Sequence, residues 1–333
     1  MTSLERTVEF LRGGTVDRIP FHPIVMRFAA RHGGVPYRAF CLDPGAHIEA
    51  MARTAESFAM DWVNVMSDPY AEAEAYGMRI EYPEDGLPHE AGPLALDASA
   101  ADTIRAPRDL SHPRLAGRLR QIEGFARRFG DRQFVVGWVE GPFAVYSLWR
   151  GLSEACLDLY DNPSVVRRGV QVAVEFAKRF AEAQVLAGAH AIGMGDAVCS
   201  QIGPEQYREF FLEGEREIVA HVHSLGALAK LHICGNTSKL LPDMIGTGAD
   251  IVDVDHLAGS MAPFAPMLGP GQVFCGSSDP VRVVRDGNPE SVRASVSRCR
   301  DEALGRAIVS AGCEIPPETD PANLRAMAQA ASA

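Results

Sequence analysis

The chain has 333 residues, 47% of them hydrophobic, and its 32 basic and 43 acidic side chains give a formal net charge of −11. The length fits either about two ordinary domains or one (β/α)₈ barrel, which takes roughly 250 residues or more. The acidic balance argues against a protein that binds nucleic acid through a basic face. The sequence has no apolar run of about 18 residues and begins with a charged segment, so we expect neither a membrane span nor a signal peptide.

Helix-like and strand-like segments alternate along the chain. A helix is predicted over 3–12, and an extended segment follows at 18–23. Further strands are predicted over 62–65, 134–139, 191–195, 227–233, 251–255, 273–276 and 307–310. Further helices are predicted over 44–58, 113–129, 144–161, 163–186, 204–225, 240–245, 289–304 and 321–331. Residues 78–106 carry several turn signals and are predicted to form an inserted hairpin.

This alternation defines the expected fold class. Strands separated by helices of roughly 10 to 20 residues pair in parallel through right-handed crossovers. Enough units are present to close a barrel, and no Gly-x-Gly-x-x-Gly motif follows the first strand, which counts against an open dinucleotide-binding sheet. We therefore expect residues 1–333 to form a single (β/α)₈ TIM barrel with an N-terminal extension and the inserted hairpin.

Reactive side chains gather where the predicted strands end. In a parallel barrel the loops at the C-terminal ends of the strands build the active site. The side chains at these ends are Asp68, Glu140, Asp196, His232 with Cys234, Asp255 with His256, Cys275 and Cys313. Their coincidence at several strands predicts a site at this end of the barrel.

The sharpest local pattern is a His-x-Cys pair. In an extended segment His232 and Cys234 point to one side, and Gly235 allows a tight turn after them. Imidazole nitrogen and thiolate sulfur are favoured zinc ligands, and three protein ligands with one open position are typical of catalytic zinc. Cys313, after the last strand, is the natural third ligand, and Cys275 competes with it. The alternative is a core histidine with unrelated buried thiols, because seven scattered cysteines do not form a disulfide framework.

Other strand-end and loop residues each have more than one interpretation. Asp196 can ligate a metal, contact a substrate or cap a helix. Asp68 precedes a proline and also suits a structural turn, and Asp255 with the following histidine suits either support of the ligands or a loop hydrogen bond. On a helix, Arg27 and Arg31 would share a face and clamp an anion, unless they are a plain surface pair.

Two segments carry a family resemblance that runs over nearly the whole chain. His-Ile-Cys-Gly-Asn at 232–236 and Ala-Gly-Cys-Glu-Ile-Pro-Pro-Glu-Thr at 311–319 resemble the uroporphyrinogen decarboxylase superfamily. The first segment is similar to its branch of zinc-dependent methylcobamide methyltransferases. This resemblance implies that His232, Cys234 and Cys313 bind Zn²⁺. It also implies that a methyl group moves from a methyl-corrinoid to tetrahydrofolate or to a thiol such as coenzyme M. The chain has no recognisable corrinoid-binding segment, so the corrinoid is expected on a partner protein.

The same superfamily implies a second function, the decarboxylation of a tetrapyrrole or another acidic substrate. The decarboxylases use an N-terminal arginine motif, a strand-end aspartate and a tyrosine, and Arg27 with Arg31, Asp68 and Tyr146 resemble these groups. They carry a histidine where this chain has Cys313, and they lack the His-x-Cys pair. These two departures favour the methyltransferase.

The motifs and the resemblance together give each residue an expected role. The predicted catalytic residues are Asp196 and Asp68, the predicted cofactor-binding residues are Arg27, Arg31, Tyr146 and Asp255, and the predicted metal ligands are His232, Cys234 and Cys313. We expect a cytoplasmic monomer or homodimer that contacts a corrinoid-binding protein and a small methyl acceptor, without nucleic acid or membrane. A non-catalytic corrinoid- or metal-binding protein on the same barrel is the third interpretation.

Overall fold

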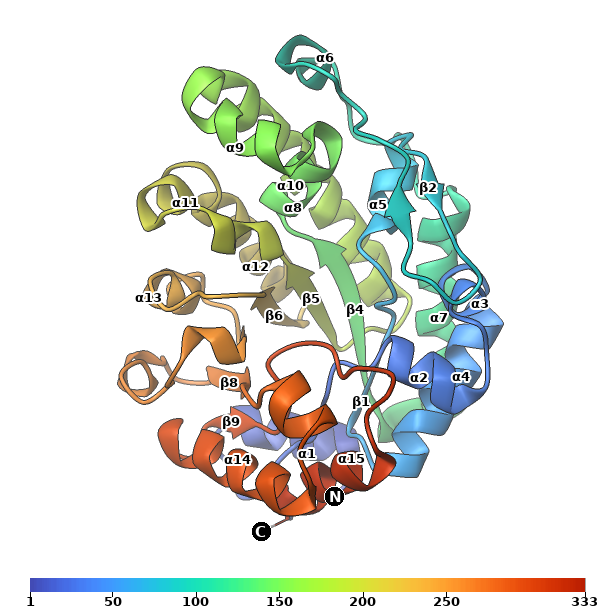
Figure 1. The fold of residues 1–333 in the computed structure, drawn as a ribbon, viewed down its shortest axis with the longest axis vertical. Coiled ribbons are helices and arrows are strands. Elements are labelled where there is room, and N and C mark those ends of the chain that lie inside the picture. Colours follow the sequence, from blue (N-terminus) through green and yellow to red (C-terminus); the bar gives the residue numbers. More distant parts are fainter. Residues whose placement is uncertain (333) are drawn as a thin grey trace.

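The computed structural model describes residues 1–332 and is built around a curled sheet of seven parallel strands (Figure 1). The strands are β1 (Trp62–Asn64), β4 (Phe134–Glu140), β5 (Ala191–Gly195), β6 (Leu228–Ile233), β7 (Ile251–Val254), β8 (Val273–Gly276) and β9 (Ala307–Ile308). They lie side by side in chain order, and each pair of neighbours is parallel. This order follows from βα units that all wind in one direction.

The two edges of the sheet meet at the extended segment around Phe21. Phe21 forms a parallel bridge with Val309, just beyond β9. Its carbonyl oxygen accepts a hydrogen bond of 2.9 Å from the backbone N–H of Asp61, just before β1. The segment therefore fills an eighth position between the first and the last strand. The predicted (β/α)₈ barrel is confirmed.

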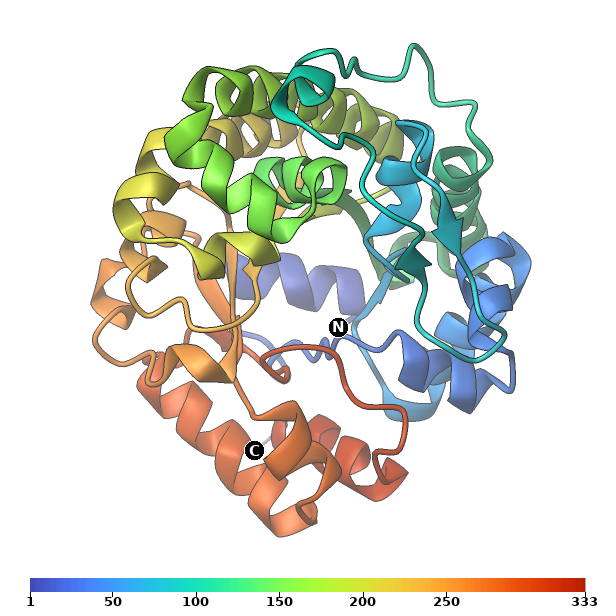
Figure 2. The same cartoon turned by 45° about the horizontal axis from the view of Figure 1, so that its top comes forward.

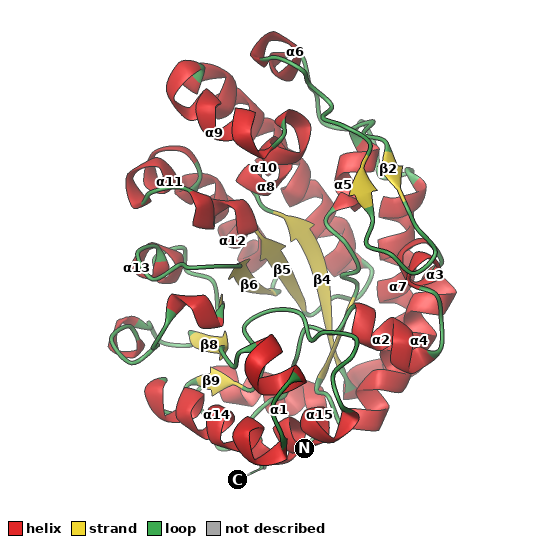
Figure 3. Ribbon diagram, in the orientation of Figure 1, coloured by secondary structure: helices red, strands yellow, loops and turns green. Residues whose placement is uncertain are grey.

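Helices surround the strands on the outside (Figure 3). They are α1 (Ser3–Leu11), α2 (Arg27–Gly33), α3 (Tyr37–Leu42), α4 (Pro44–Phe58), α5 (Tyr70–Ala75), α6 (Ala98–Asp102), α7 (Pro113–Phe129), α8 (Pro142–Arg150), α9 (Leu152–Asp161), α10 (Pro163–Leu186), α11 (Pro204–Phe210), α12 (Leu212–Ser224), α13 (Leu241–Ile245), α14 (Pro289–Glu302) and α15 (Pro321–Ala330). Helices α4, α7 and α10 have the predicted bounds, because each begins with a proline at its first position.

Two helices that the sequence predicts as continuous are each divided into two helices in the structure, so their predicted continuity is wrong. The predicted helix 144–161 is divided into α8 and α9 at Gly151, whose φ of 81° lies in the left-handed region that a helix excludes. The predicted helix 204–225 is divided into α11 and α12 at Phe211, whose ring stacks on Phe143 of α8. Tertiary packing interrupts a hydrophobic pattern that is continuous in the sequence.

The inserted hairpin is present between β1 and α7. Strands β2 (Ile80–Glu81) and β3 (His89–Glu90) pair antiparallel and form a separate small sheet. Helix α6 follows before the chain returns to the barrel at α7. The hairpin and α6 together fall within the predicted excursion at 78–106.

The lower interior of the barrel, at the N-terminal ends of the strands, is apolar. Its side chains are Trp62, Phe134, Val136, Ala191, Ile251, Val273, Cys275 and Ile308. Helix α1 covers this end with Leu11, and Leu4, Val8 and Phe10 pack beside it. In Figure 2 α1 is visible in dark blue across the middle of the ring. The N-terminal extension therefore closes the bottom of the barrel.

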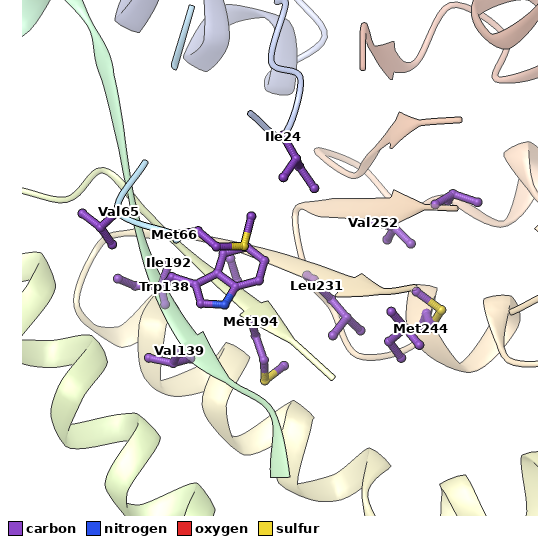
Figure 4. Close-up of a cluster of buried hydrophobic side chains, with 14 of the residues drawn as sticks. Ile24, Val65, Met66, Trp138, Val139, Ile192, Met194, Leu231, Met244 and Val252 are labelled. Atoms are coloured by element: carbon purple, nitrogen blue, oxygen red, sulfur yellow. The ribbon is translucent and has the colours of Figure 1, made fainter. Parts of the chain in front are cut away.

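A second, larger apolar cluster joins the outward faces of the strands and the helices around them to some inward side chains, among them Trp138 of β4. Figure 4 labels Ile24, Val65, Met66, Trp138, Val139, Ile192, Met194, Leu231, Met244 and Val252 from this cluster. Trp138 lies flat against β5, since a Cβ atom added at Gly193 or Gly195 would come within 2.4 Å or 2.7 Å of its indole.

Among the described residues, none of the helices combines the length and apolarity that crossing a bilayer requires.

Candidate functional site

Three metal-ligand side chains converge at the C-terminal end of the barrel. His232 is the penultimate residue of β6, Cys234 follows that strand, and Cys313 follows the parallel bridge of Ala311 with Ser278. The Nε2 atom of His232 lies 2.7 Å from Sγ of Cys234, which lies 3.3 Å from Sγ of Cys313. The three ligand atoms all lie within 4.8 Å of one another.

This arrangement fits a tetrahedral metal ion. Ligand atoms around zinc at ordinary bond lengths are roughly 3.5 to 3.8 Å apart, so small side-chain movements would seat the ion. Two thiols and one imidazole are a donor set that zinc favours. Gly235, with φ of 91°, turns the chain directly after Cys234, and a Cβ atom there would lie 2.8 Å from Oγ of Ser200. No fourth ligand atom joins the group within residues 1–332.

Hydrogen bonds and neighbouring charges shift the pKa values of these three groups. The hydrogen bond between the two thiols lowers the pKa of Cys313 to about 5 and raises the pKa of Cys234. Burial alone would lower the pKa of His232, but the Asp253 carboxylate raises this pKa to about 10. Metal binding requires deprotonated thiols and a neutral imidazole, so it releases the protons held here.

A buried ion pair lies directly beside His232. The Oδ2 atom of Asp253 lies 2.6 Å from Nζ of Lys230 and 3.4 Å from Nδ1 of His232. Lys230 is 1% exposed and Asp253 is fully buried. Neither residue is predicted to take part from the sequence. The available signal was the position of Lys230, two residues before His232 in a strand, which places both side chains on one face.

Asp255 supports the turn that follows Cys234. Its Oδ2 atom accepts a hydrogen bond of 2.8 Å from the backbone N–H of Gly235, and its Oδ1 atom accepts one of 3.0 Å from Leu257. Nδ1 of His256 lies 2.8 Å from Oδ1. The structure thus brings Asp255 next to the three ligands, at the end of the adjacent strand.

Asp68 lies in a separate buried network after β1. Its carboxylate pairs with Arg114, which also pairs with Glu74 at 2.9 Å. Arg118 donates a hydrogen bond of 3.1 Å to the carbonyl oxygen of Asp68. Burial alone would raise the pKa of Asp68, but the two guanidinium groups lower it below its ordinary value. The Asp68 side chain is therefore already held by protein cations.

Asp196 directly follows β5, and its side chain contacts the first turn of α8. Its two carboxylate oxygens accept hydrogen bonds from the backbone N–H groups of Phe143 at 3.1 Å and Ala144 at 2.6 Å. Its ligand atoms group with those of Cys199 and Glu215, not with the three ligands described above. Burial raises the pKa of Asp196 to about 6.

Arg27 and Arg31 lie on α2 and line the same open pocket of about 440 Å³, together with Glu318. The backbone N–H of Arg27 donates a hydrogen bond of 2.7 Å to Glu314, the residue after Cys313. The pocket therefore borders the loop that carries the third ligand. Arg27 and Arg31 thus line one pocket beside the acidic residues Asp85 and Glu318, and their role as an anion clamp stays a prediction.

Tyr146 and Cys275 are not brought to this pocket or to the three ligands. The hydroxyl of Tyr146 donates a hydrogen bond of 2.7 Å to Asp158, which also pairs with Arg150 at 2.7 Å, so it joins α8 to α9. Cys275 is fully buried, packs with the apolar side chains of the lower interior and is the Cα partner of Asp253 in the adjacent strand. The group of three ligands contains Cys313, not its competitor Cys275.

Two buried carboxyl groups lie near the end of β4. The backbone N–H of Glu140 donates a hydrogen bond of 2.8 Å to Oε1 of Glu72, and Oε1 of Glu140 accepts one of 3.0 Å from Trp138. Burial raises the pKa of Glu72 to about 8 and also raises the pKa of Glu140. The sequence placed Glu140 at a strand end but gave no signal for Glu72, which lies in the short helix α5.

The substitution Glu72→Gln is expected to reduce the loss of stability at alkaline pH. The folded chain keeps a proton on Glu72 that the unfolded chain loses above about pH 4.5, so stability falls as pH rises from there through about 8. Glutamine retains an acceptor for Glu140 and does not titrate. Urea unfolding at about pH 5 and pH 9 measures the effect, with exposed Glu182→Gln as the control. Equal pH dependence in wild type and E72Q would contradict it.

These features define a (β/α)₈-barrel protein with a His-Cys-Cys cluster at the C-terminal ends of its strands. The model of one family, described as uroporphyrinogen decarboxylase (URO-D), matches residues 2–333. The chain belongs to this family, and the expectation drawn from its two motifs is confirmed.

Relatives in this family have two kinds of name. The chain is 27% identical to the "Methylcobamide:CoM methyltransferase MtbA" of Methanosarcina mazei, and the match covers 99% of the chain and 97% of the relative. It is 26% identical to the "Uroporphyrinogen decarboxylase" of Nocardia farcinica, over 89% of the chain and 85% of the relative. A solved structure, "methyltransferase from Methanosarcina mazei", matches with a TM-score of 0.90 at 22% identity, over 99% and 98% of the two chains. The solved structure supports the barrel fold.

Proposed function

We propose that the protein is a methyltransferase that moves a methyl group from a methyl-corrinoid, carried by a partner protein, to a small thiol. The observation that carries this proposal is the convergence of His232, Cys234 and Cys313 at the C-terminal end of the barrel. The methylcobamide:CoM methyltransferase among the relatives, which matches almost the full length of both chains, supports the same reaction class.

The three converging residues would hold Zn²⁺, with a fourth position left for the acceptor. When bound, Zn²⁺ would lower the pKa of an acceptor thiol and so supply a thiolate at neutral pH. Cys234 and Cys313 would bind as thiolates, and His232 would present Nε2, the atom that faces Cys234. Asp255 would keep the turn at Gly235 in place through its hydrogen bond to the backbone.

The remaining steps concern the two substrates. Transfer forms a sulfur–carbon bond and breaks the carbon–cobalt bond of the corrinoid, whose electron pair stays on cobalt. The pocket of Arg27 and Arg31 borders the Cys313 loop, and it would bind an anionic group of the thiol acceptor or of tetrahydrofolate, the other acceptor that the family resemblance implies. Catalytic roles for Asp68 and Asp196, a binding role for Tyr146, a cytoplasmic location and a monomeric or homodimeric state stay predictions.

A methyl-transfer assay tests the proposal. Zinc-loaded protein is incubated with methylcobalamin and either 2-mercaptoethanesulfonate, a neutral thiol or tetrahydrofolate, and demethylation is followed by the cobalamin spectrum. We expect transfer to at least one thiol and loss of transfer after the metal is removed by a chelator. Transfer by metal-free protein would contradict the metal site. Absence of transfer to every acceptor would contradict the function.

Decarboxylation is the second candidate. It is favoured by the pocket of Arg27 and Arg31, by the buried Asp68 and by the decarboxylase among the relatives. The three metal-type ligands have no use in a metal-free decarboxylase, and for this reason we place it second. Incubation with uroporphyrinogen and analysis for coproporphyrinogen distinguishes the two candidates.

A further inference from the structure

We propose that Asp253 and Lys230 form a positioning pair inside the barrel, which orients the His232 imidazole so that its Nε2 atom faces the metal. This inference rests on the metal site of the proposed function, and it concerns metal binding rather than the methyl-transfer reaction. Neither residue belongs to the three ligands, and neither was expected to take part from the sequence.

The strand register places the three side chains together. His232 of β6 and Asp253 of β7 are Cα partners in the parallel ladder, so their side chains leave the sheet next to each other on one face. Lys230 lies two residues before His232 and shares that face. Oδ2 of Asp253 is the common atom, 2.6 Å from Nζ of Lys230 and 3.4 Å from Nδ1 of His232.

Burial keeps water away from the contact between Asp253 and His232. Asp253 and Lys230 are 0% and 1% exposed, and His232 is 5% exposed, so water does not replace a lost partner easily. In the described part of the chain, both carboxylate oxygens of Asp253 and Nδ1 of His232 lack a hydrogen bond of good geometry, so the contacts of Oδ2 with Lys230 and His232 are close ion pairs. A slight rotation of the imidazole would direct Nδ1–H at the carboxylate. A carboxylate behind a metal-binding histidine fixes its tautomer and its orientation.

Lys230 is held in place from below. Its Nζ atom lies 5.7 Å from the centre of the Trp62 ring, and Trp62 stacks on His22 at 4.3 Å. The ammonium group therefore has an aromatic face beneath it and the Asp253 carboxylate beside it. Together Lys230 and Asp253 carry no net charge, so they orient His232 without adding charge to a site of two thiolates and a divalent ion.

The test uses the full-length protein and the metal alone. The variants are Asp253→Asn, Lys230→Met and their combination, with Cys299→Ala, which changes a buried cysteine of α14, as the control. Zinc affinity is measured by competition with a chelator, the site geometry by the visible absorption of the Co²⁺-loaded protein, and folding by thermal unfolding of the metal-free protein. We expect D253N to weaken zinc binding about 10- to 100-fold and to shift the cobalt bands.

The combined variant separates positioning from folding. If Lys230 acts through Asp253, the double variant binds zinc about as weakly as D253N alone, because the two effects are not additive. The double variant also removes both buried charges, which avoids leaving one of them unpaired if a single variant fails to fold. Wild-type affinity and cobalt spectrum in D253N, or in the double variant if D253N does not fold, would overturn the proposal, as would additive losses that follow thermal stability alone.

The result is independent of the methyl-transfer assay. Wild-type protein that binds zinc but transfers no methyl group would overturn the proposed function and leave the positioning pair intact. Wild-type protein that transfers the methyl group, with D253N unchanged in affinity and spectrum, would overturn the positioning pair alone.

Discussion

Cys313→Ala is expected to abolish metal binding and methyl transfer together. The substitution removes one of two thiolates from a site of three protein ligands, and Cys234 and His232 cannot complete a tetrahedral site without it. We expect zinc content to fall from about one ion per chain to near zero, and the affinity to fall by more than the roughly 100-fold that an outer-shell change costs. Metal analysis after gel filtration and the methylcobalamin assay measure both effects.

Cys275→Ala is the control for this prediction. Cys275 is also a strand-end cysteine in the sequence, but the structure places it in the lower interior, among apolar side chains. Its replacement by alanine removes one sulfur from the core and is expected to leave zinc binding unchanged. If C275A lost zinc while C313A retained it, Cys275 would be the third ligand.

Arg114→Met is expected to destabilise the fold by about 3–5 kcal/mol, since it leaves the Asp68 carboxylate buried without its nearest cation. Urea unfolding at neutral pH measures the change. The pH dependence provides a second readout, because the guanidinium groups keep the pKa of Asp68 below its ordinary value of 3.8. That stabilisation is present above about pH 4 and is lost as pH falls through the lower pKa that Asp68 has in the folded protein. The difference in the free energy of unfolding between R114M and wild type is therefore expected to become smaller in acid.

Two controls accompany Arg114→Met. The double variant with Asp68→Asn removes the unpaired charge and is expected to recover part of the lost stability. Arg167→Met removes a similar guanidinium from the exposed pair with Glu209 and is expected to cost about 0–1 kcal/mol. Equal losses in R114M and R167M would show that burial of Asp68 does not determine the effect.

The sequence predicted the elements with strong local signals and missed those that depend on packing. Helix α4 has an N-terminal proline and a cap from Asp43, and its bounds were predicted correctly. The break at Phe211 lies in a continuous hydrophobic pattern, and only the contact of its ring with Phe143 accounts for it. The eighth barrel position at Phe21 is a single bridge without a strand's periodicity, so the sequence indicated an extended segment and not its partners.

The candidate site divides in the same way. His232 and Cys234 are two residues apart, so their spacing alone placed them on one face. The position of Cys313 after the last strand made it the natural third ligand, and the family resemblance favoured it over Cys275. Asp253 could not be predicted as a neighbour of His232, because their proximity depends on the register of two strands. A lysine is normally expected at the surface. Lys230 is buried because its side chain points into the closed barrel, which the sequence alone does not show.

The bridge of Phe21 with Val309 has a consequence for how the chain folds. The two residues come from opposite ends of the sequence, so the loop closed by their pairing includes nearly the whole protein, and this pairing carries a large entropic cost. During synthesis the Phe21 segment can already contact Asp61 beside β1, but its other edge has no partner until Val309, just beyond β9, has left the ribosome. Exposed strand edges of this kind promote association with other chains. Nascent or truncated chains that end before residue 307 are therefore the form of this protein most exposed to aggregation.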